Sequence, residues 1–337
     1  MKKPSMRDIG REIGVSVATV SKAMAGKPGM SEEMRRRILD KAEEMGYQLP
    51  ASGGEDAQKS VDLGILVPEA FFGANSYYAD VYKGLVQQVT EAGHFTLVEL
   101  IGQEAEETLT LPKMLDHRRV SGIIMLGQPR REYYRMIAQQ GIPVVFLDFY
   151  DEQASADAVV GDNSYGCYRL TSHLIKNGHS RIGFVGNYRA TSSIMDRYLG
   201  FYRAMLSHEL PVRDEWIIMD RYPDNRLLEE LPLPEVLPTA FVCNCDVVAR
   251  RLINQLSEKG LRVPEDISVT GYDDFEMERA PGPGISTFRV DRYAMVDVAV
   301  KTLLDRCAGS NKPFGRTVIG GQTVYRESEG LCRTANG

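Results

Sequence analysis

The sequence predicts a small all-α domain followed by a larger α/β domain with two lobes. Residues 5–46 contain three amphipathic segments with helix start and stop signals. After residue 60, short apolar strands alternate with helical stretches, which is typical of parallel sheets covered by helices on both faces. About 275 residues with this alternation are too many for one such sheet, so we expect two lobes, each built on a doubly wound parallel sheet.

The first domain is predicted to hold three short helices. The first, "SMRDIGREIG", begins at Ser5, which can form a capping box with Asp8, and ends at Gly14. The second and third begin at the caps Ser16 and Ser31 and end at Gly26 and Gly46. Their expected buried faces are Met6, Ile9 and Ile13; Val20 with Ala23 or Met24; and Met34, Ile38, Ala42 and Met45.

Two short helices separated by the turn "GVS" are the pattern of a helix-turn-helix. The second helix presents Val17, Ala18, Ser21 and Lys22 away from the predicted core. Small side chains such as Val17 and Ala18 allow contact with thymine methyl groups in the major groove, and Lys22 can reach guanine acceptors. Ser16, Thr19 and the amides at the helix N-terminus suit phosphate oxygens. A small helical bundle whose exposed residues bind nothing is the alternative.

The charge distribution favours an anionic partner for this domain. Residues 1–50 hold ten Lys/Arg and seven Asp/Glu, a net of +3. The remaining residues hold 30 and 39, a net of −9, and together the two parts give the total of −6. A small basic region beside an acidic body indicates an anionic partner for the first region only. Ordinary solvated surface charge is the alternative reading.

The segment "MRDIGREIGVSVATVSKAMAGKPGMSEEMRRRILDKAEEMGYQLP" resembles the DNA-binding headpiece of the LacI/GalR family of bacterial transcriptional regulators. The match is long and without gaps. In that family the second helix reads operator bases, which implies this role for Val17, Ala18 and Lys22. The resemblance places Ser16, Thr19 and Ser21 at positions that contact the DNA backbone or support the helix. It also implies a homodimer on a near-palindromic operator.

Eight strands are predicted in the second domain. Near-continuous apolar runs are typical of buried parallel strands. The runs are 62–68, 95–100, 122–127, 143–148, 181–186, 216–220, 240–244 and 267–273. The predicted domains are a headpiece at 1–48, a linker at 49–60 and a binding and dimerisation domain at 61–337. Within it, lobe 1 is expected at about 61–160 plus 291–325 and lobe 2 at about 161–290.

Polar and aromatic residues recur directly after these strands. Open α/β sheets bind ligands beyond the C-terminal ends of their strands, so the recurrence predicts a binding cleft. Carboxylates, an arginine and aromatic rings suit a polyhydroxylated ligand, although each residue alone is better explained as a helix cap or a surface charge. The residues include Phe71, Phe72, Asp148, Phe149, Tyr150, Asp220, Arg221, Tyr222, Cys245, Asp246, Asp273 and Asp274, with Arg197 at a predicted helix start.

The second domain resembles the effector-binding domain of the same family, which is similar to periplasmic sugar-binding proteins. The matching segments are "VVGDNSYGCYRLTSHLIKNGHSRIGFVG", "VPEDISVTGYDD" and "ISTFRVD". The family's effector contacts carry over to Asp148, Arg197 and Asp273, and less directly to Phe71, Phe72, Tyr222, Asp246 and Arg292. Where the family has Asn-Asp, this chain has Cys245-Asp246. One amide contact to the ligand is therefore missing, which argues against a standard hexose.

No metal, cofactor or catalytic site is predicted. The cysteines of "CNC" have no histidine nearby in sequence and are interpreted as structural thiols rather than metal ligands. His173 and His179 lie in a segment that the resemblance identifies as structural, so capping or packing is their expected role. Five cysteines, no signal-peptide core in "MKKPSMRDIGREIG" and no apolar run of about 18 residues together predict a cytoplasmic protein.

Three functions remain open from the residues. The first is a transcriptional regulator, expected to be a repressor, whose affinity for DNA changes when a small molecule, expected to be a sugar, binds between the lobes. The second is a glycoside hydrolase that uses two cleft carboxylates, although no pair at a catalytic distance is specified. The third is a plain solute-binding protein, against which the headpiece and the missing export signal both argue.

The linker departs from the family pattern. The family has Pro-Asn followed by an Ala-Arg-x-Leu motif, which forms a hinge helix on operator DNA and inserts its leucine into the minor groove. Here Pro50 is followed by "ASGGEDA". Gly53 and Gly54 each cost roughly 1 kcal/mol in a helix relative to alanine, and Glu55 and Asp56 would repel phosphates. We expect no hinge helix, a reduced operator kink and a signal carried by the separation of the two headpieces.

Overall fold

The computed structural model describes residues 5–24, 30–45, 47, 61–72, 76–275 and 282–333. The chain divides into two compact units, Met1–Lys59 and Ser60–Gly337, which are described separately. The linker prediction for residues 49–60, and the predicted helix ends at Gly26 and Gly46, lie outside the described residues. No helix in the described part is both long enough and apolar enough to cross a bilayer.

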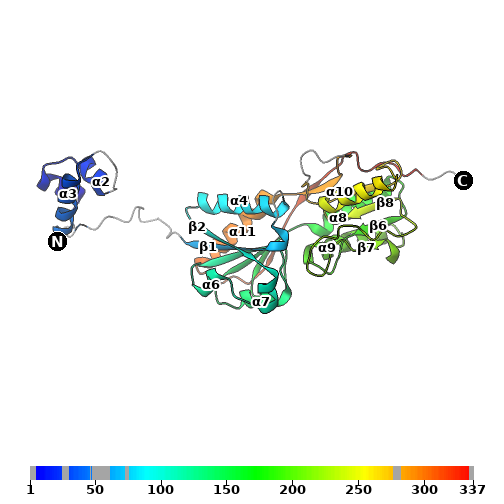
Figure 1. Cartoon of the computed structure of the whole chain (residues 1–337), viewed down its shortest axis with the longest axis horizontal. Helices are drawn as coiled ribbons and strands as arrows, with labels where there is room; N and C mark the ends of the chain where they lie inside the picture. Colours follow the sequence, from blue (N-terminus) through cyan, green and yellow to red (C-terminus); the bar gives the residue numbers. More distant parts are fainter. Residues whose placement is uncertain are drawn as a thin grey trace. The chain divides into compact units, whose positions relative to one another are not determined.

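The first unit contains the three predicted helices, α1 (Met6–Ile13), α2 (Val17–Met24) and α3 (Glu32–Glu44) (Figure 1). The capping box at the start of α1 is confirmed, because Ser5 and Asp8 each accept from the other's backbone N–H. Gly14 ends α1 in the left-handed conformation, with φ +81°. The Ser31 hydroxyl accepts from the N–H of Met34 at 3.3 Å and caps α3.

A small apolar core holds these helices together. The buried side chains come from all three, namely Ile9, Val20, Ala23, Ile38 and Ala42, with the predicted methionines partly buried around them. The turn between α1 and α2 requires a glycine in the last turn of α1. The N–H groups of Gly14 and Val15 both donate to the Gly10 carbonyl, and a Cβ at Gly10 would lie 2.7 Å from the carbonyl oxygen of Val15. The turn therefore fixes the direction of α2 relative to α1.

Lobe 1 of the second unit is a six-stranded parallel sheet with the order β11-β5-β4-β3-β1-β2. Alternate residues of each central strand point to opposite faces, as Ile124 and Leu126 of β3 do against Ile123 and Met125. Helices α4 and α11 cover one face, and α6 and α7 lie on the other (Figure 1). The bounds are β1 Asp62–Pro68, β2 Phe95–Ile101, β3 Gly122–Leu126, β4 Val144–Leu147, β5 Asp157–Gly161, β11 Arg316–Ile319, α4 Tyr77–Glu91, α5 Gln103–Thr108, α6 Lys113–Asp116, α7 Arg131–Ala138 and α11 Arg292–Cys307, with a 3-10 turn at Glu69–Phe71.

Lobe 2 is a four-stranded parallel sheet with the order β7-β6-β8-β9. Phe184 packs on the side of α8 and α9, whereas Val185 packs on the side of α10, so this sheet is also covered on both faces. The bounds are β6 Ile182–Val185, β7 Ile217–Ile218, β8 Ala240–Cys243, β9 Ser268–Thr270, α8 Asn163–Lys176, α9 Ser192–Ser207 and α10 Asp246–Glu258, with a 3-10 turn at Asp214–Trp216. The fold class is the predicted one, two doubly wound parallel sheets.

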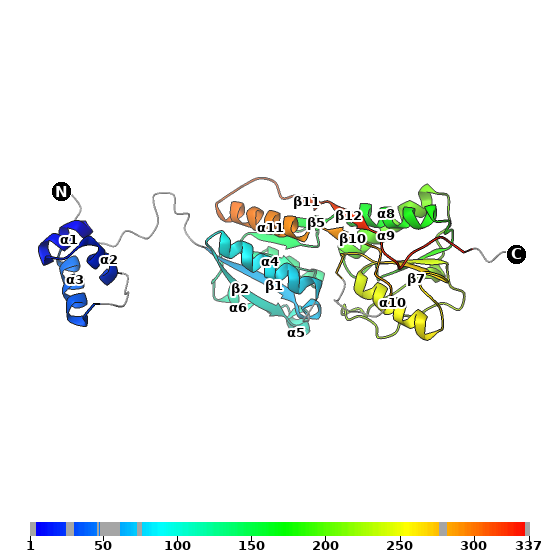
Figure 2. The ribbon, with the colours of Figure 1, turned by 90° about the horizontal axis from the view of Figure 1, so that it is seen from above.

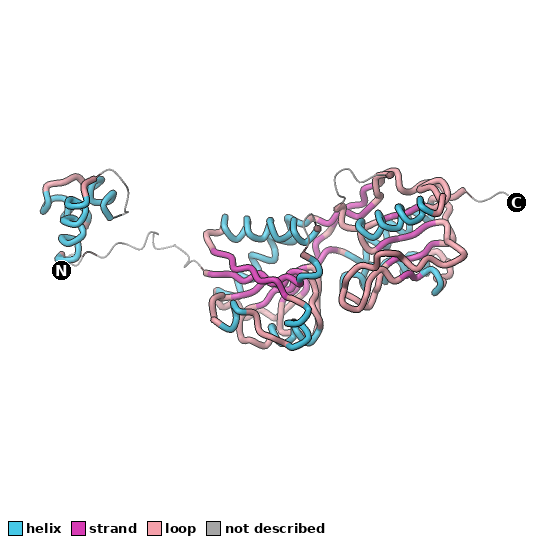
Figure 3. Tube along the Cα trace, viewed as in Figure 1, coloured by secondary structure: helices cyan, strands magenta, loops and turns pink. Residues whose placement is uncertain are grey.

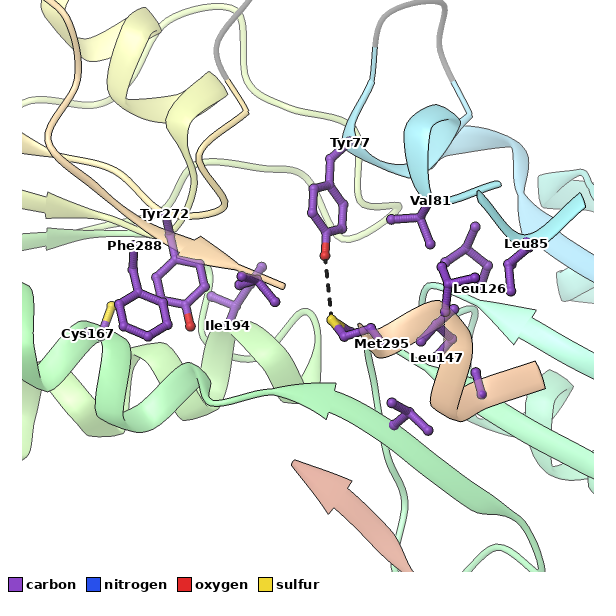
Figure 4. Close-up of a cluster of buried hydrophobic side chains, with 14 of the residues drawn as sticks. Tyr77, Val81, Leu85, Leu126, Leu147, Cys167, Ile194, Tyr272, Phe288 and Met295 are labelled. Carbon is purple, nitrogen blue, oxygen red and sulfur yellow. Dashed lines mark hydrogen bonds between the residues drawn. The ribbon is translucent and has the colours of Figure 1, made fainter. Parts of the chain in front are cut away.

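Three chain crossings join the lobes. The chain passes from β5 into α8, returns through β10 (Thr287–Val290), and crosses again after β11 through β12 (Gly321–Val324). β10 and β12 pair antiparallel at the junction of the lobes (Figure 2). Beyond β12 the chain lies on lobe 2, where the N–H of Val269 donates to the carbonyl of Ser328. In Figure 4 the stacked rings of Tyr272 and Phe288 lie beside Cys167 at this junction.

The predicted strands are all present, with two differences (Figure 3). The run at 216–220 contributes only the two residues of β7, because Trp216 belongs to a 3-10 turn and Asp220 turns away to bind Arg221. Four further strands, β5, β10, β11 and β12, were not predicted. β11 is an exposed edge strand and β12 a short partner of β10, so neither reads as a buried apolar run.

Candidate functional site

Helix α2 exposes the residues predicted to contact DNA. Val17, Ala18, Ser21 and Lys22 are exposed, while Val20 and Ala23 on the opposite side are buried. Val17 is 42% exposed although it is apolar, which leaves its methyl groups free for contact. This arrangement is what a helix needs to enter a major groove while its other side packs on a core.

Ser16 and Thr19 combine a structural role with an exposed hydroxyl group. The Ser16 hydroxyl accepts from the N–H of Thr19 at 3.1 Å and shares a hydrogen bond with the Thr19 hydroxyl at 2.8 Å. One of the two hydroxyl hydrogens is used in that bond, so the other stays available to an acceptor. The first N–H groups of a helix have no intrahelical partner, and they suit a phosphate at the same place.

A hollow of about 450 Å³ lies between the two lobes at the C-terminal ends of their strands. Five of the predicted effector residues line it: Phe71, Asp148, Arg197, Asp246 and Asp273. Its other lining residues are Ala70, Ser76, Tyr77, Tyr78, Thr191, Ser193, Ile194, Arg221, Asn225, Arg226, Leu227, Asn244, Cys245, Val247 and Phe275.

Arg197, on α9, is the central charge of the hollow and is 5% exposed. All three of its nitrogens donate: Nε to Asn163 at 2.8 Å, Nη1 to the carbonyl of Asn244 at 2.6 Å, and Nη2 to Asp273 at 3.0 Å. Its guanidinium also lies 4.0 Å from the ring centroid of Tyr272. Burial alone would lower the pKa of Arg197, but the neighbouring Asp273 outweighs it and the pKa is raised. The side chain therefore remains charged and fixed.

Asp148 faces Arg197 from lobe 1, directly after β4. Its φ of +70° turns the carboxyl away from the strand, and the Tyr78 hydroxyl donates to it at 2.8 Å. Burial raises the pKa of Asp148 to about 6, with the charge of Arg197 opposing the shift and that of Asp273 adding to it. This carboxyl titrates near neutral pH, so a ligand that donates hydrogen bonds to it will favour its ionised form.

Asp246 and Asp273 come from the ends of β8 and β9. Burial, and then the charge of Asp273, raise the pKa of Asp246 to about 8. Asp246 Oδ2 accepts from the N–H of Phe275 at 2.8 Å, and the buried Oδ1 faces Gly271; the hydrogen bonds from Thr287 and Phe275 lower the pKa but do not outweigh burial. A Cβ at Gly271 would lie 2.0 Å from that Oδ1, so the glycine makes room for the carboxyl. Asp246 is thus a neutral acid at pH 7.

A second arginine is fixed on the lobe 2 wall. Arg221 forms a two-pronged ion pair with Asp220 at 2.7 to 3.1 Å and donates to Asn244 Oδ1 at 3.2 Å. Asp220 also accepts from Asn244 Nδ2 and from the N–H of Asn187. Burial would raise the pKa of Asp220, but Arg221 and these hydrogen bonds outweigh it and hold the pKa below its usual range. Both carboxyl oxygens are therefore satisfied.

Three predicted effector residues lie away from the lining of the hollow. Phe72 packs edge-to-face on Tyr82, because the 3-10 turn before it directs Phe71 inward instead. Tyr222 is 45% exposed and lies under Arg226. Arg292 begins α11 behind the wall, with its guanidinium 5.9 Å from the ring of Tyr77 and equally far from that of Phe275. It supports the aromatic wall instead of lining the hollow.

Residues that sequence reasoning missed supply much of the wall. Tyr77 and Tyr78 start α4 after the cap Ser76, and they line the hollow although they follow no strand directly. In Figure 4 the Tyr77 hydroxyl points to the sulfur of Met295, a contact of 4.0 Å. Asn244, the residue before the Cys-Asp pair, holds both arginines. The sequence feature that could have indicated these wall residues is the pair of adjacent tyrosines at the start of a capped helix.

Beside the hollow, a set of hydrogen bonds links the lobes directly. The N–H of Tyr150 donates to the Ser192 hydroxyl at 3.1 Å, and the Tyr150 hydroxyl donates to Asp196 at 3.0 Å. The N–H of Ser192 donates to Gln128 at 2.8 Å. Arg316 of β11 lies over the Tyr150 ring at 4.2 Å. Tyr150, Gln128 and Arg316 belong to lobe 1, and Ser192 and Asp196 to lobe 2, so we call this set the interlobe latch.

His173 and His179 have structural partners, and Cys245 carries a neutral thiol. His179 bonds to Thr239 at 3.0 Å and to the carbonyl of Gly330 at 3.1 Å, and His173 bonds to Glu329 at 3.0 Å. Both tie α8 and its C-terminal turn to the last segment of the chain. Burial raises the pKa of Cys245 to about 12, so its thiol is neutral. Among the described residues, no three His, Cys, Asp or Glu side chains are grouped to hold a metal ion.

Known families match both units. Residues 5–49 match the model for bacterial regulatory proteins of the lacI family, and residues 171–329 match the model for a periplasmic binding protein-like domain. The ribose operon repressor of Haemophilus influenzae is 26% identical over 96% of this chain and 98% of its own length. The repressor PurR of Actinobacillus pleuropneumoniae is 28% identical over 90% of each chain.

Solved structures share the fold over nearly the whole chain. A complex of the transcriptional regulator CelR with cellobiose has a TM-score of 0.68 at 21% identity, covering 96% of this chain and 99% of its own. A lac repressor dimer bound to operator and the anti-inducer ONPF has a TM-score of 0.67 at 20% identity, covering 98% and 100%. The chain belongs to the LacI/GalR family of bacterial transcriptional regulators, and it is therefore a DNA-binding regulator rather than an enzyme.

Proposed function

We propose that this chain is a homodimeric repressor that binds a near-palindromic operator through α2 and responds to a sugar bound between its lobes. Ser16, Val17, Ala18, Thr19, Ser21 and Lys22 are the proposed DNA contacts. The observation that carries the proposal is the buried Arg197, held by Asp273 and facing Asp148 inside an interlobe hollow. We propose the cytoplasm as its site of action, because operator DNA lies there in bacteria.

The chemistry of the hollow supports a polyhydroxylated effector. Asp148 and Asp273 accept hydrogen bonds, the protonated Asp246 and the hydroxyls of Thr191 and Ser193 can donate them, and the arginines do so as charged groups. The rings of Phe71, Tyr78 and Phe275 offer apolar faces to the C–H face of a sugar ring. Related proteins carry sugars in their names: a ribose operon repressor, and solved regulators with bound cellobiose or ribose.

Two exposed apolar faces support the homodimer. β2 is the edge strand of the lobe 1 sheet and exposes Phe95, Val98 and Leu100, with Phe95 at 68%. On lobe 2, α9 exposes Leu199, Tyr202 and Leu206, with Leu206 at 67%. A long edge strand with exposed apolar residues favours self-association, and a two-fold interface buries the same patch on both subunits. We propose that both faces lie in the dimer interface.

The operator contact is tested by comparing two lysine variants. Lys22→Ala should weaken binding to the selected operator by about 1–3 kcal/mol, because a base contact is lost, and should relax selectivity at one position of each half-site. Lys41→Ala is the control, since Lys41 lies on α3 and pairs with Glu44. The measurement is a salt titration of DNA binding on operators selected from a random library. Equal binding of Lys22→Ala and wild type to every selected sequence would refute the contact.

A further inference from the structure

The hollow between the lobes continues outward into a second one. The outer hollow has a volume of about 230 Å³ and is lined by lobe 1 residues from the ends of β1, β2 and β3 and by a lobe 2 turn after β7. Ala70, Phe71, Asn225 and Arg226 line both hollows. The two spaces therefore adjoin at these four residues. Gln103, Glu106 and Arg130 of lobe 1 and Asp224 of lobe 2 also line the outer hollow.

An aromatic pair leads from the inner to the outer hollow. Phe71 lines both, and its ring stacks on Tyr78 with centroids 5.2 Å apart and planes 29° apart. Tyr78 in turn donates to Asp148 in the inner hollow. Both rings rest on Gly127, where a Cβ would lie 3.0 Å from the Phe71 ring and 3.2 Å from that of Tyr78. The pair forms a continuous apolar surface from the charged site to the junction of the two hollows.

The opposite side of the junction is a fixed turn of lobe 2. The N–H of Tyr222 donates to the carbonyl of Arg226 at 2.9 Å, and that of Asn225 donates back to Tyr222 at 3.0 Å. Asn225 takes a left-handed conformation with φ +67°, which asparagine tolerates. Arg226 Nε is 2.7 Å from Asp224, so the arginine is held across the turn. The turn begins at Arg221, so it is anchored by the same Asp220 ion pair that builds the inner wall.

The outer hollow offers polar groups of both signs. Glu106 accepts from the N–H of Arg130 at 2.6 Å through Oε2 alone, and burial raises the pKa of its carboxyl. The Gln103 amide, the Asn225 amide and the Arg226 guanidinium add donors at the same place. This mixture suits hydroxyl groups, which both donate and accept, better than it suits a purely anionic or purely apolar group.

We propose that the outer hollow is a second subsite, which holds the second ring of a disaccharide whose first ring binds at Asp148, Arg197 and Asp273. This inference rests on the proposed sugar-binding function and adds the size of the effector. An inner hollow of about 450 Å³ lies within the range of roughly 300–1,000 Å³ for ligand pockets, and the outer one extends it in one direction. Phe71 covers the linkage between the rings.

The test compares each monosaccharide with its own disaccharides. Isothermal titration of the full chain would use D-glucose against cellobiose and maltose, D-galactose against lactose, and D-xylose against xylobiose. We expect one disaccharide to bind at least tenfold more tightly than its monosaccharide, which corresponds to about 1.4 kcal/mol. Equal affinities of a bound monosaccharide and every disaccharide would overturn the subsite and leave the sugar site intact. Binding of no saccharide of either length would overturn the sugar proposal itself.

A matched pair of variants on α5 locates the second ring. Gln103→Trp fills the outer hollow and should reduce the ratio of disaccharide to monosaccharide affinity from tenfold or more to near one. Glu104→Trp places the same bulk one residue further along, at an exposed position outside both linings, and should leave the ratio unchanged. Monosaccharide binding reports correct folding in the same titration. An unchanged ratio in Gln103→Trp would show that both rings fit in the inner hollow and would overturn the proposal.

Discussion

The two walls of the effector cleft are built in different ways. On the lobe 2 wall, the buried Arg197 and the partly buried Arg221 are already bonded to Asp273, Asp220 and Asn244. The lobe 1 wall consists of tyrosine and phenylalanine rings and one carboxyl, Asp148, whose hydrogen-bonding partner is the Tyr78 hydroxyl. The first wall is preorganised, and little reorganisation is needed when a ligand binds there. The second wall supplies apolar cover and a carboxyl that responds to pH.

This difference predicts that changes to lobe 2 affect stability and binding together, whereas changes to lobe 1 affect mainly binding. A buried ion pair that loses one partner leaves an uncompensated charge, which is expensive. Loss of a single neutral hydrogen bond on a partly open wall costs much less. The following variants test the difference in order of expected effect.

Removing the central arginine should have the largest effect. Arg197→Ala leaves the carboxylate of Asp273 buried without its partner, so we expect a loss of about 3–5 kcal/mol in the free energy of unfolding and no measurable sugar binding. Thermal or urea unfolding and titration calorimetry measure the two effects. Arg203→Ala on the same helix is the control, since Arg203 is exposed and lies over the Tyr168 ring. Wild-type stability of Arg197→Ala would contradict a preorganised lobe 2 wall.

Asp246 is the exception on the lobe 2 wall, because burial raises its pKa and, among the described residues, neither Arg197 nor Arg221 forms an ion pair with it. Its pKa is about 8 in the folded protein and about 3.9 in an unfolded chain, so the folded state holds a proton that the unfolded chain has released. The corresponding stability is fully present below about pH 4 and is lost as the pH rises through about 8. Stability should therefore fall between pH 5 and pH 9.

Asp246→Asn cannot ionise, so the fall in unfolding free energy between pH 5 and pH 9 should be smaller than in wild type by a few kcal/mol. Urea unfolding at pH 5, 7 and 9 measures this difference. Asp305→Asn, at an exposed position of α11, is the matched control and should follow the wild-type curve. If wild type and Asp246→Asn show the same pH dependence, Asp246 does not hold a proton in the folded protein.

On the lobe 1 wall, Tyr78→Phe should cost much less stability than Arg197→Ala and should shift the pH dependence of sugar affinity. The lost hydrogen bond stabilises the folded chain by about 1 kcal/mol. That bond also lowers the pKa of Asp148, so without it the pKa should rise above about 6 and more of the carboxyl should be protonated at pH 7. The loss of affinity on acidification should begin at a higher pH. Calorimetry between pH 5 and pH 8 measures the midpoint.

Tyr82→Phe is the control for this variant, because Tyr82 lies on the same helix and contacts Phe72 through its ring. It should retain wild-type affinity at every pH. If the pH midpoint of sugar affinity is the same in Tyr78→Phe and wild type, the ionisation of Asp148 does not control ligand binding.

The lobe 2 wall was more predictable from the sequence than the lobe 1 wall. Asp273 and Asp246 follow strands directly, and position after a strand is visible in sequence. Tyr78 begins a helix, and its bond to Asp148 joins residues 70 positions apart, which no local pattern encodes. The pKa of Asp148 likewise depends on burial and on Arg197, both products of the folded chain.

The fold shows the same division between local and long-range information. Buried parallel strands such as β1 and β8 are apolar runs and were predicted within one residue at each end. β10 and β12 form a two-stranded ribbon between the lobes, and their pairing depends on chain crossings that sequence periodicity does not show. In the headpiece, where caps and core spacing are local, all three helix starts were predicted.

The interlobe latch connects the two walls and should give the smallest effect. Tyr150→Phe removes the hydrogen bond to Asp196 but keeps the ring under Arg316, so the cost in stability should be about 0.5–1.5 kcal/mol. The bond joins lobe 1 to lobe 2, so its loss favours any arrangement in which the lobes have moved apart. Sugar affinity and operator affinity should then change together, whereas Tyr293→Phe, at an 81% exposed position, should change neither. The contradicting result is a Tyr150→Phe protein whose sugar affinity changes while its operator affinity in the presence of sugar does not. The interlobe latch would then affect ligand binding without affecting DNA binding.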